Sequence, residues 1–324
     1  MNSGQPNRVS VIDPVTPAID RVKLILFKPF DLGKWFIIGF CAWLAYLGTG
    51  GGPGGGGGPG GGGSGPPYNV PQQEIKHAIE DAKYYVSNNL YWIVPVAVTV
   101  IVLIILIGFL VSWLNSRGRF MFLHCVVLNK AEVKIPWNKF RQHANSLFLF
   151  RIVLGLIGFV VIVAPIIGIV VLIVMMASGT APVIVSIPGL IILGLALFAL
   201  SILLFLVKKF TFDFVVPIMF LRMSSCTVAW REFMAVLSAN KLRFTLYLLF
   251  QIVIKIVIGV MIGIGFCIGL CFCCASCLLL VPYIGTVILL PVHVFTRSYS
   301  LYYLQQYGKQ FDVFRSEIET IESV

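Results

Sequence analysis

The residues with the plainest capacity for chemistry are cysteines, and five of the eight lie in FCIGLCFCCASC, from Phe266 to Cys277. Their thiolates could bind a metal, with Cys267, Cys271, Cys274 and Cys277 as the ligands. Zinc sites, however, use C-x-x-C pairs separated by a dozen or more residues. Buried cysteine also acts as a small apolar residue that lets helices pack closely. We predict helix packing and no bound metal, with a disulfide or a metal site as the alternatives.

Ionisable and polar residues inside apolar segments form the second group of candidates. Lys255, in FQIVIKIVIG, has Gln251 one turn earlier on the same helical face. Together they could bind an anionic group, or Lys255 could simply reach the interface. Arg151, at the cytoplasmic end of an apolar segment, can place its charge among headgroups. Asp213 and His293 lie near other cytoplasmic ends and could reach inward, with capping or solvation as the alternative.

Catalysis is not indicated by the acidic residues, of which the chain has only 13. They form no HExxH motif, no serine–histidine–acid arrangement and no pair of catalytic carboxylates. No Asp or Glu lies in a clear apolar span, where proton-coupled carriers usually place one. We therefore expect no enzyme activity and no cofactor.

The composition requires lipid as part of the solvent. Hydrophobic residues make up 58% of the 324 residues and charged residues 11%, whereas soluble domains have about 25% charged residues. The first twenty residues contain no continuous apolar core, so no cleavable signal is expected. The net charge of +11 is spread over short stretches between apolar runs. This distribution indicates membrane topology and no nucleic-acid partner.

The apolar runs predict an all-α, polytopic membrane protein with six transmembrane helices. Trp92–Trp113, Ile152–Ala177 and Ile187–Val207 each contain the roughly 20 residues that a span requires. The 52 residues of Phe244–Phe295 suit two spans joined by a turn. Trp35–Gly48 has only 14 residues, or about 21 Å of helix, and is a marginal first span.

Basic residues alternate between the connections in a way that assigns their sides. Lys and Arg number five before Trp35, two in the next connection, seven from Arg117 to Arg151, six from Lys208 to Arg243 and three in the tail. The two remaining connections have none. The positive-inside rule then places both termini in the cytoplasm and the protein in the cell (inner) membrane.

Related patterns occur three times along the chain. IPWNKFRQHANSLFLFRIVLG begins at Ile135 and VAWREFMAVLSANKLRFTLYLL at Val228, and a looser form, AIDRVKLILFKPFDLGKWFIIGF, begins at Ala18. Each is predicted to be an interfacial amphipathic helix that leads into a pair of spans. The aromatic residues expected to anchor these helices at the headgroups are Trp35, Trp137, Trp230, Phe140 and Phe233.

Each predicted helical hairpin is followed by a basic, aromatic-rich stretch. These three stretches are SRGRFMFLHCVVL from Ser116, KKFTFDFVVPIMFL from Lys208 and FTRSYSLYYLQQY from Phe295. The chain therefore divides into three repeats, 15–129, 130–222 and 223–308, within one membrane domain.

The remaining segments are predicted to be tails and a linker. Residues 1–14 are expected to be disordered, and 309–324 form an acidic cytoplasmic tail. Residues 48–65 hold 14 of the 31 glycines and should act as a coiled linker outside the membrane, followed by an external helix before Trp92.

This layout, with FKPFDLGKWFIIGF at the start and a basic-aromatic step after each hairpin, resembles bacterial membrane proteins similar to the membrane domain attached to glycerophosphodiester phosphodiesterases. The likeness covers about residues 15–306. The catalytic half of those enzymes is a (β/α) barrel of about 250 residues, for which no room remains, so their activity is not expected here.

We expect a non-catalytic integral membrane protein that serves membrane organisation or lipid-linked homeostasis, as a scaffold or lipid-binding module. The alternative is a transporter or channel for a small or anionic solute. The expected partners are the bilayer and its anionic headgroups. A protein partner or a second copy of the chain is not identified by sequence.

Overall fold

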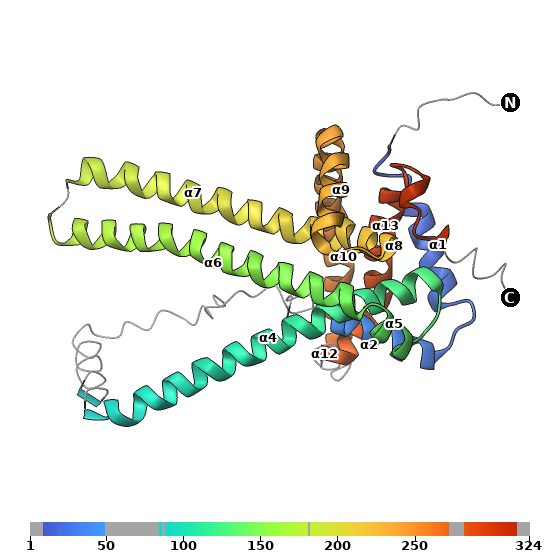
Figure 1. Ribbon diagram of the computed structural model, residues 1–324, viewed down its shortest axis with the longest axis horizontal. Helices are drawn as coiled ribbons and strands as arrows, with labels where there is room; N and C mark the ends of the chain where they lie inside the picture. Colours follow the sequence, from blue (N-terminus) through green and yellow to red (C-terminus); the bar gives the residue numbers. More distant parts are fainter. Residues whose placement is uncertain (1–8, 49–83, 86–87, 181, 272–281, 316–324) are drawn as a thin grey trace.

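The computed structural model describes residues 9–48, 84–85, 88–180, 182–271 and 282–315. In these ranges the chain forms helices and no strand. Figure 1 shows a packed body from which long helices project. The elements are α1 (Val15–Leu26), α2 (Leu32–Tyr46), α4 (Leu90–Leu128), α5 (Lys134–Lys139), α6 (Arg141–Ala177), α7 (Val183–Phe210), the π-helix η1 (Thr211–Val215), α8 (Val216–Arg222), α9 (Cys226–Ala239), α10 (Lys241–Cys271), α12 (Pro282–Ile288), α13 (Leu290–Gln305) and the 3₁₀ turn η2 (Lys309–Phe311).

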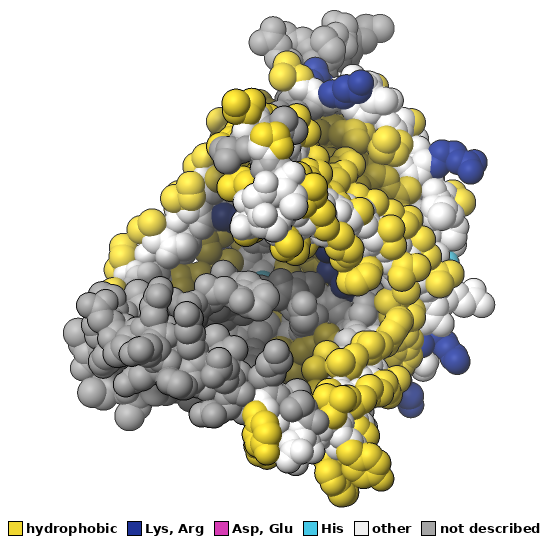
Figure 2. All heavy atoms as spheres, turned by 90° about the vertical axis from the view of Figure 1, so that its left-hand side faces the viewer, with side chains coloured by type: hydrophobic (Ala, Val, Ile, Leu, Met, Phe, Trp, Pro, Cys, Tyr) yellow, Lys and Arg dark blue, Asp and Glu magenta, His cyan; other side chains and the backbone are white. Residues whose placement is uncertain are grey.

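Four of the described helical segments are long and apolar enough to cross a membrane, namely Leu90–Leu128, Arg141–Ala177, Ser186–Arg222 and Lys241–Gly265. Viewed toward the free ends of the long helices, Figure 2 shows apolar side chains over much of the visible surface. A water-soluble chain would bury such residues. The described residues thus confirm the prediction of an all-helical chain, with four helices that could span a membrane. The first apolar helix, α2, is shorter, at 15 residues.

Helix α4 extends beyond the membrane and into the body. Its 39 residues correspond to about 58 Å, nearly twice the roughly 30 Å hydrocarbon thickness. The apolar side chains from Val94 to Leu110 are almost all exposed, whereas every residue from Asn115 to Val127 is buried. The same helix thus passes from a lipid-facing surface to a protein core.

The core is formed by the three basic, aromatic-rich stretches that follow the apolar hairpins in the sequence. Buried residues concentrate at the end of α4, in η1 and α8, and along α13. Rings of α9 and α10 complete this core: Phe214 of η1 lies with its centroid 5.0 Å from that of Tyr247 in α10 and 5.3 Å from that of Phe233 in α9. Such aromatic pairs add to the stabilisation from apolar burial.

Two arginine contacts join the first helix to this core. Arg21 of α1 donates hydrogen bonds to the carbonyl oxygens of Val126 and Val127, at 3.0 and 2.6 Å. These carbonyls belong to the last turn of α4, where the helix leaves acceptors unpaired and carries partial negative charge. The Arg21 guanidinium also lies 4.9 Å from the ring centroid of Phe314.

Both ends of the described chain are more ordered than expected. Residues 9–14, predicted to be disordered, pack on α13: the Ser10 amide donates to Gln306 Oε1 at 2.7 Å, and Tyr299 donates to the Val11 carbonyl at 2.9 Å. After residue 308, Phe311 and Val313 are buried. Residues of both segments therefore pack against the body, because apolar and aromatic side chains there complete the core.

Two of the predicted headgroup anchors lie in the protein interior. Phe140 is 2% exposed and Phe233 is fully buried. Phe140 stacks on Phe220 with centroids 4.8 Å apart. Both rings contact protein and not headgroups, because the aromatic core shields them from water more completely. Trp35, Trp137 and Trp230 are half-buried at its edge.

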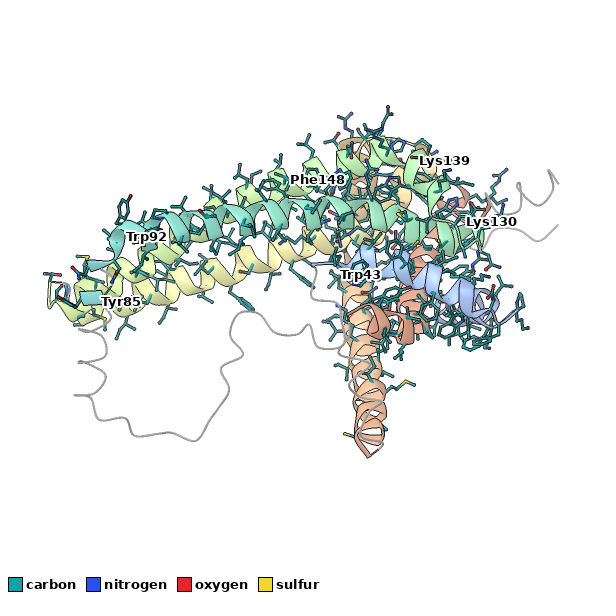
Figure 3. All side chains as sticks on the ribbon, turned by 90° about the horizontal axis from the view of Figure 1, so that it is seen from below. Trp43, Tyr85, Trp92, Lys130, Lys139 and Phe148 are labelled. Carbon is teal, nitrogen blue, oxygen red and sulfur yellow. The ribbon has the colours of Figure 1, made fainter. Side chains whose placement is uncertain are left out.

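The long helices do not form one parallel bundle. Helices α6 and α7 lie side by side as an antiparallel pair, and α4 diverges from them (Figure 1). Figure 3 shows α10 leaving the body at a wide angle to α4, α6 and α7. Helix α10 begins at Lys241, directly after Asn240, the C-cap of α9. Most of the glycine run, and residues 272–277 of the cysteine cluster, lie outside the described residues.

We predict that Gly118→Ala destabilises the protein, whereas Gly108→Ala does not. A Cβ at Gly118 would lie 2.5 Å from the backbone nitrogen of Ala45, so α2 would have to move away from α4. Overpacking of this kind costs about 1–3 kcal/mol. Gly108 is the matched control on the same helix, because a Cβ there meets nothing within 4 Å. Thermal unfolding in detergent tests this, and equal stability of the two variants would contradict the packing of α2 on α4.

Candidate functional site

A cavity of about 660 Å³ lies where the long helices enter the body. Its lining residues come from α2, α4, α6, α7, η1, α10 and α13 and the turn after α2: Tyr46, Gly48, Ser112, Arg119, Arg151, Leu154, Gly155, Phe205, Lys208, Lys209, Thr211, Phe212, Lys255 and Thr296. All five charged residues of this lining are basic, and none of the lining residues is acidic. Figure 2 shows Lys and Arg side chains in the hollow between apolar surfaces.

Two arginines of the cavity are held by one asparagine. Asn115 Oδ1 accepts a hydrogen bond from Nε of Arg119 at 2.9 Å and another from Nη1 of Arg151 at 2.6 Å. The Asn115 amide is itself fixed, because its Nδ2 donates to the Ala45 and Leu47 carbonyls at 2.7 and 2.8 Å. A buried amide on α4 therefore brings two like charges together at the cavity wall.

A third guanidinium, that of Arg297, lies against the ring of the lining residue Phe212. Phe212 lies between Arg119 and Arg297, whose guanidinium carbons are 4.5 and 4.8 Å from its centroid. The Phe212 carbonyl also accepts from Arg297 Nη1, at 2.6 Å. Phe212 belongs to the π-helix η1, and such turns occur often at functional sites. Two cations thus contact the same aromatic ring.

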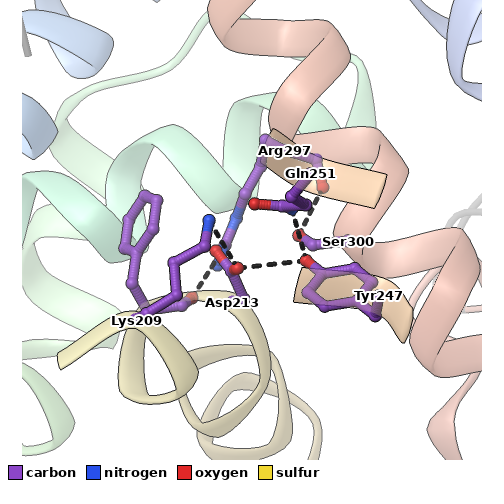
Figure 4. Close-up of polar contacts among 7 residues, drawn as sticks. Lys209, Asp213, Tyr247, Gln251, Arg297 and Ser300 are labelled. Carbon is purple, nitrogen blue, oxygen red and sulfur yellow. Dashed lines mark hydrogen bonds and ion pairs between the residues drawn. The ribbon is translucent and has the colours of Figure 1, made fainter. Parts of the chain in front are cut away.

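One carboxylate balances part of this charge. Asp213 forms an ion pair with Lys209 at 2.7 Å and accepts a hydrogen bond from the Tyr247 hydroxyl at 3.0 Å. Gln251 donates to the same hydroxyl at 2.6 Å (Figure 4). Asp213 is 2% exposed. This network orders the side of the cavity where η1 meets α10.

Burial lowers the pKa of the Arg297 guanidinium, while Tyr46 and Asp213 nearby raise it. An arginine side chain nevertheless stays protonated in proteins. Its positive charge therefore remains behind Phe212 at neutral pH.

Two exposed lysines also line the cavity. Lys208 at the end of α7 and Lys255 on α10 are both exposed. Each has a long flexible stem that can carry its ammonium group toward a bound anion.

The five polar candidates from the sequence lie close together. Arg151 and Lys255 line the cavity, and Asp213 and Gln251 form the network beside it. His293 is 9% exposed, and its ring centroid lies 4.4 Å from that of the lining residue Tyr46. The structure thus places all five around one cavity, although their proposed binding roles stay predictions.

Sequence analysis did not select Arg119, Lys209 or Phe212, although they lie at the centre of the site. All three belong to the basic, aromatic-rich stretches that follow the first and second apolar hairpins. The recurrence of this pattern was the available signal. The sequence showed this recurrence as a repeat, and the structure adds that the three stretches contact one another.

The described side chains do not suggest nucleophilic chemistry. Burial raises the pKa of the Cys226 thiol to about 12, so this cysteine is a thiol at neutral pH and a poor nucleophile. In the described part of the chain, no three His, Cys, Asp or Glu residues are grouped to hold a metal. Of the predicted ligand cysteines, Cys267 is exposed, and the side chains of Cys271, Cys274 and Cys277 lie outside the described set.

A family model matches residues 9–281, which is most of the chain. The protein belongs to DUF7544, a family of unknown function. No similar curated protein and no similar solved structure was found. The matched range contains α1 to α10 and therefore nearly all of the cavity lining, apart from Thr296 of α13.

We predict that Asp213→Leu destabilises the protein by about 3–5 kcal/mol, because it leaves buried positive charge without its carboxylate. Lys209→Met alone should cost less, since Asp213 keeps the hydrogen bond from Tyr247. Combining Lys209→Met with Asp213→Leu should recover part of the loss, because a pair of apolar residues needs no neutralisation. Denaturation of the three variants tests this, and strictly additive losses would show that the ion pair does not couple the two residues.

Proposed function

We propose that this protein binds the anionic headgroup of a membrane lipid in the basic cavity, as a non-catalytic module in membrane organisation or lipid-linked homeostasis. The observation that carries this proposal is the lining, whose five charged side chains are all Lys or Arg and of which only Lys209 has a carboxylate partner, Asp213 beside the cavity. Charged groups removed from water are costly unless they are paired. An anion in the cavity would supply the missing negative charge.

A lipid is favoured because the cavity has an apolar side as well as a basic one. Leu154, Gly155 and Phe205 belong to its lining and come from α6 and α7. The same two helices expose apolar side chains along most of their length. A lipid whose headgroup is bound by the arginines could therefore keep its acyl chains against these two helices, away from water.

The proposed topology has six spans arranged as three repeats, with both termini in the cytoplasm of the cell. The positive-inside distribution of Lys and Arg supports this orientation. It assigns α2 to the short first span and part of residues 278–295 to the last. Helix α10 is assigned to the fifth span by its length and apolar character, and it leaves the body at a wide angle to α6 and α7 (Figure 3).

The alternative function is passage of a small anionic solute. One observation favours it: Lys255 lies on α10, within an apolar segment long enough to cross the membrane, and lines the cavity. A basic residue in that position is typical of a substrate pathway. Anion flux into proteoliposomes that falls with Lys255→Ala would support this alternative over a static binding site.

We predict that the purified protein binds an anionic lipid in preference to phosphatidylcholine, and that Arg151→Gln weakens this binding about tenfold. The reason is that a hydrogen bond to a charged group contributes roughly 1.5–3 kcal/mol. Native mass spectrometry, or titration of nanodiscs containing phosphatidylglycerol, measures the effect.

Arg231→Gln is the matched control, because Arg231 is an exposed residue of α9 and is not part of the cavity lining. Equal losses from Arg151→Gln and Arg231→Gln would indicate general attraction to a charged surface. Absence of any preference for anionic lipid would refute the proposed function.

We also predict that a tag in the glycine run is labelled from outside intact cells, whereas a tag after residue 324 is labelled only after permeabilisation. The connection that holds the glycine run and the carboxyl-terminal tail lie on opposite sides of the membrane if the basic residues face the cytoplasm. Labelling of both tags from the same side would contradict the proposed topology.

A further inference from the structure

We infer that the cavity selects a phosphate group with two or more negative charges, as in a phosphomonoester or diphosphate lipid, over a phosphodiester with one. This inference rests on the proposed lipid-binding function and narrows its ligand. It depends on the amount of positive charge, its rigid placement and the geometry of the donors.

The positive charge exceeds what a single negative charge can balance. Lys209 has Asp213 as its partner at 2.7 Å. Among the described residues, no carboxylate lies within ion-pair distance of the four other basic side chains that line the cavity: Arg119, Arg151, Lys208 and Lys255. Arg297 adds a further charge behind Phe212. A monoanion would therefore leave most of this charge unbalanced.

The two arginines cannot easily separate to relieve their repulsion. Both contact Asn115 Oδ1 through nitrogens at 2.9 and 2.6 Å. Arg151 Nη1 also reaches Ser116 Oγ at 3.1 Å, and the Arg119 guanidinium lies against Phe212. The protein thus holds two planar cations beside each other before any ligand binds, which is the arrangement expected where an anion with several charges bridges them.

The donor geometry favours phosphate over other anions. A guanidinium presents paired N–H groups that match two oxygens of one phosphate. Arg119 and Arg151 each use a single nitrogen on Asn115, so each has further N–H groups for a ligand. The tetrahedral oxygens of a terminal phosphate can accept from both arginines and from a lysine ammonium. A phosphodiester has two terminal oxygens where a phosphomonoester has three, and therefore offers fewer strong acceptors.

The experiment compares three lipids of different headgroup charge in nanodiscs of phosphatidylcholine. The probes are phosphatidic acid, phosphatidylglycerol and phosphatidylcholine alone, with the full chain at pH 8. We expect phosphatidic acid to bind at least about tenfold more tightly than phosphatidylglycerol. Because the second phosphate ionisation has a pKa of about 6, this preference should shrink as the pH falls below 6, while binding of phosphatidylglycerol should change little.

Variants connect the preference to the cavity. Arg151→Gln and Lys255→Gln should each reduce the preference for phosphatidic acid to about threefold or less, and the control Arg231→Gln should leave it unchanged. Lys255 is exposed, so its substitution tests the site without disturbing buried contacts. Thermal unfolding of each variant verifies that it is folded.

The outcomes separate this inference from the proposed function. Equal affinity for phosphatidic acid and phosphatidylglycerol, with both dependent on Arg151, overturns the inference and leaves the lipid-binding function in place. No binding of either lipid overturns both. Competition by millimolar inorganic phosphate or pyrophosphate that equals the lipid in affinity would support recognition of a multiply charged phosphate and overturn a lipid as its source.

Discussion

Positive charge held away from water without matching negative charge is the constraint around which this structure is arranged. Two like charges about 5 Å apart repel by roughly 3 kcal/mol at an effective dielectric constant of 20. The chain nevertheless joins Arg119 and Arg151 through one amide oxygen and places Arg297 behind the ring of Phe212. Asp213 offsets only part of this charge. The rest of the fold must therefore hold these cations close together against their repulsion.

The aromatic body performs this task by its rigidity. Packed rings lose little conformational freedom when they are buried, and the core around Phe214 and Tyr247 is dense with them. The π-helix η1 lies between this core and the cavity, with Phe212 in the cavity lining and Asp213 hydrogen-bonded to Tyr247 of the core. A basic cavity beside a stiff aromatic core suits recognition of a ligand better than a surface whose lysines move freely, because fewer side chains must be ordered upon binding.

The long apolar helices connect this site to lipid. Helix α4 is exposed along its first part and buried along its last, and α7 continues through η1 into α8 in the same way. Each helix therefore carries its chain from bilayer to body without interruption. A ligand with a charged head and apolar chains would likewise have its chains at the apolar helix surfaces and its head in the protein body.

The sequence by itself determined the solvent of this protein and the class of its elements, because apolar runs of 20 or more residues can be satisfied only in lipid and only as helices there. It also identified Arg151, Lys255, Asp213, Gln251 and His293, since an ionisable or polar group next to lipid is conspicuous in an apolar stretch. Only the tertiary structure decided that Arg151 and Lys255 line one cavity with Arg119, Lys209 and Phe212, and that Asp213, Gln251 and His293 lie beside it. It also decided that Phe140 and Phe233 face protein and that residues 9–14 are ordered. These outcomes depend on contacts between residues far apart in the chain, such as Asn115 with Arg151 and Ser10 with Gln306, and local periodicity contains no record of which distant surfaces meet.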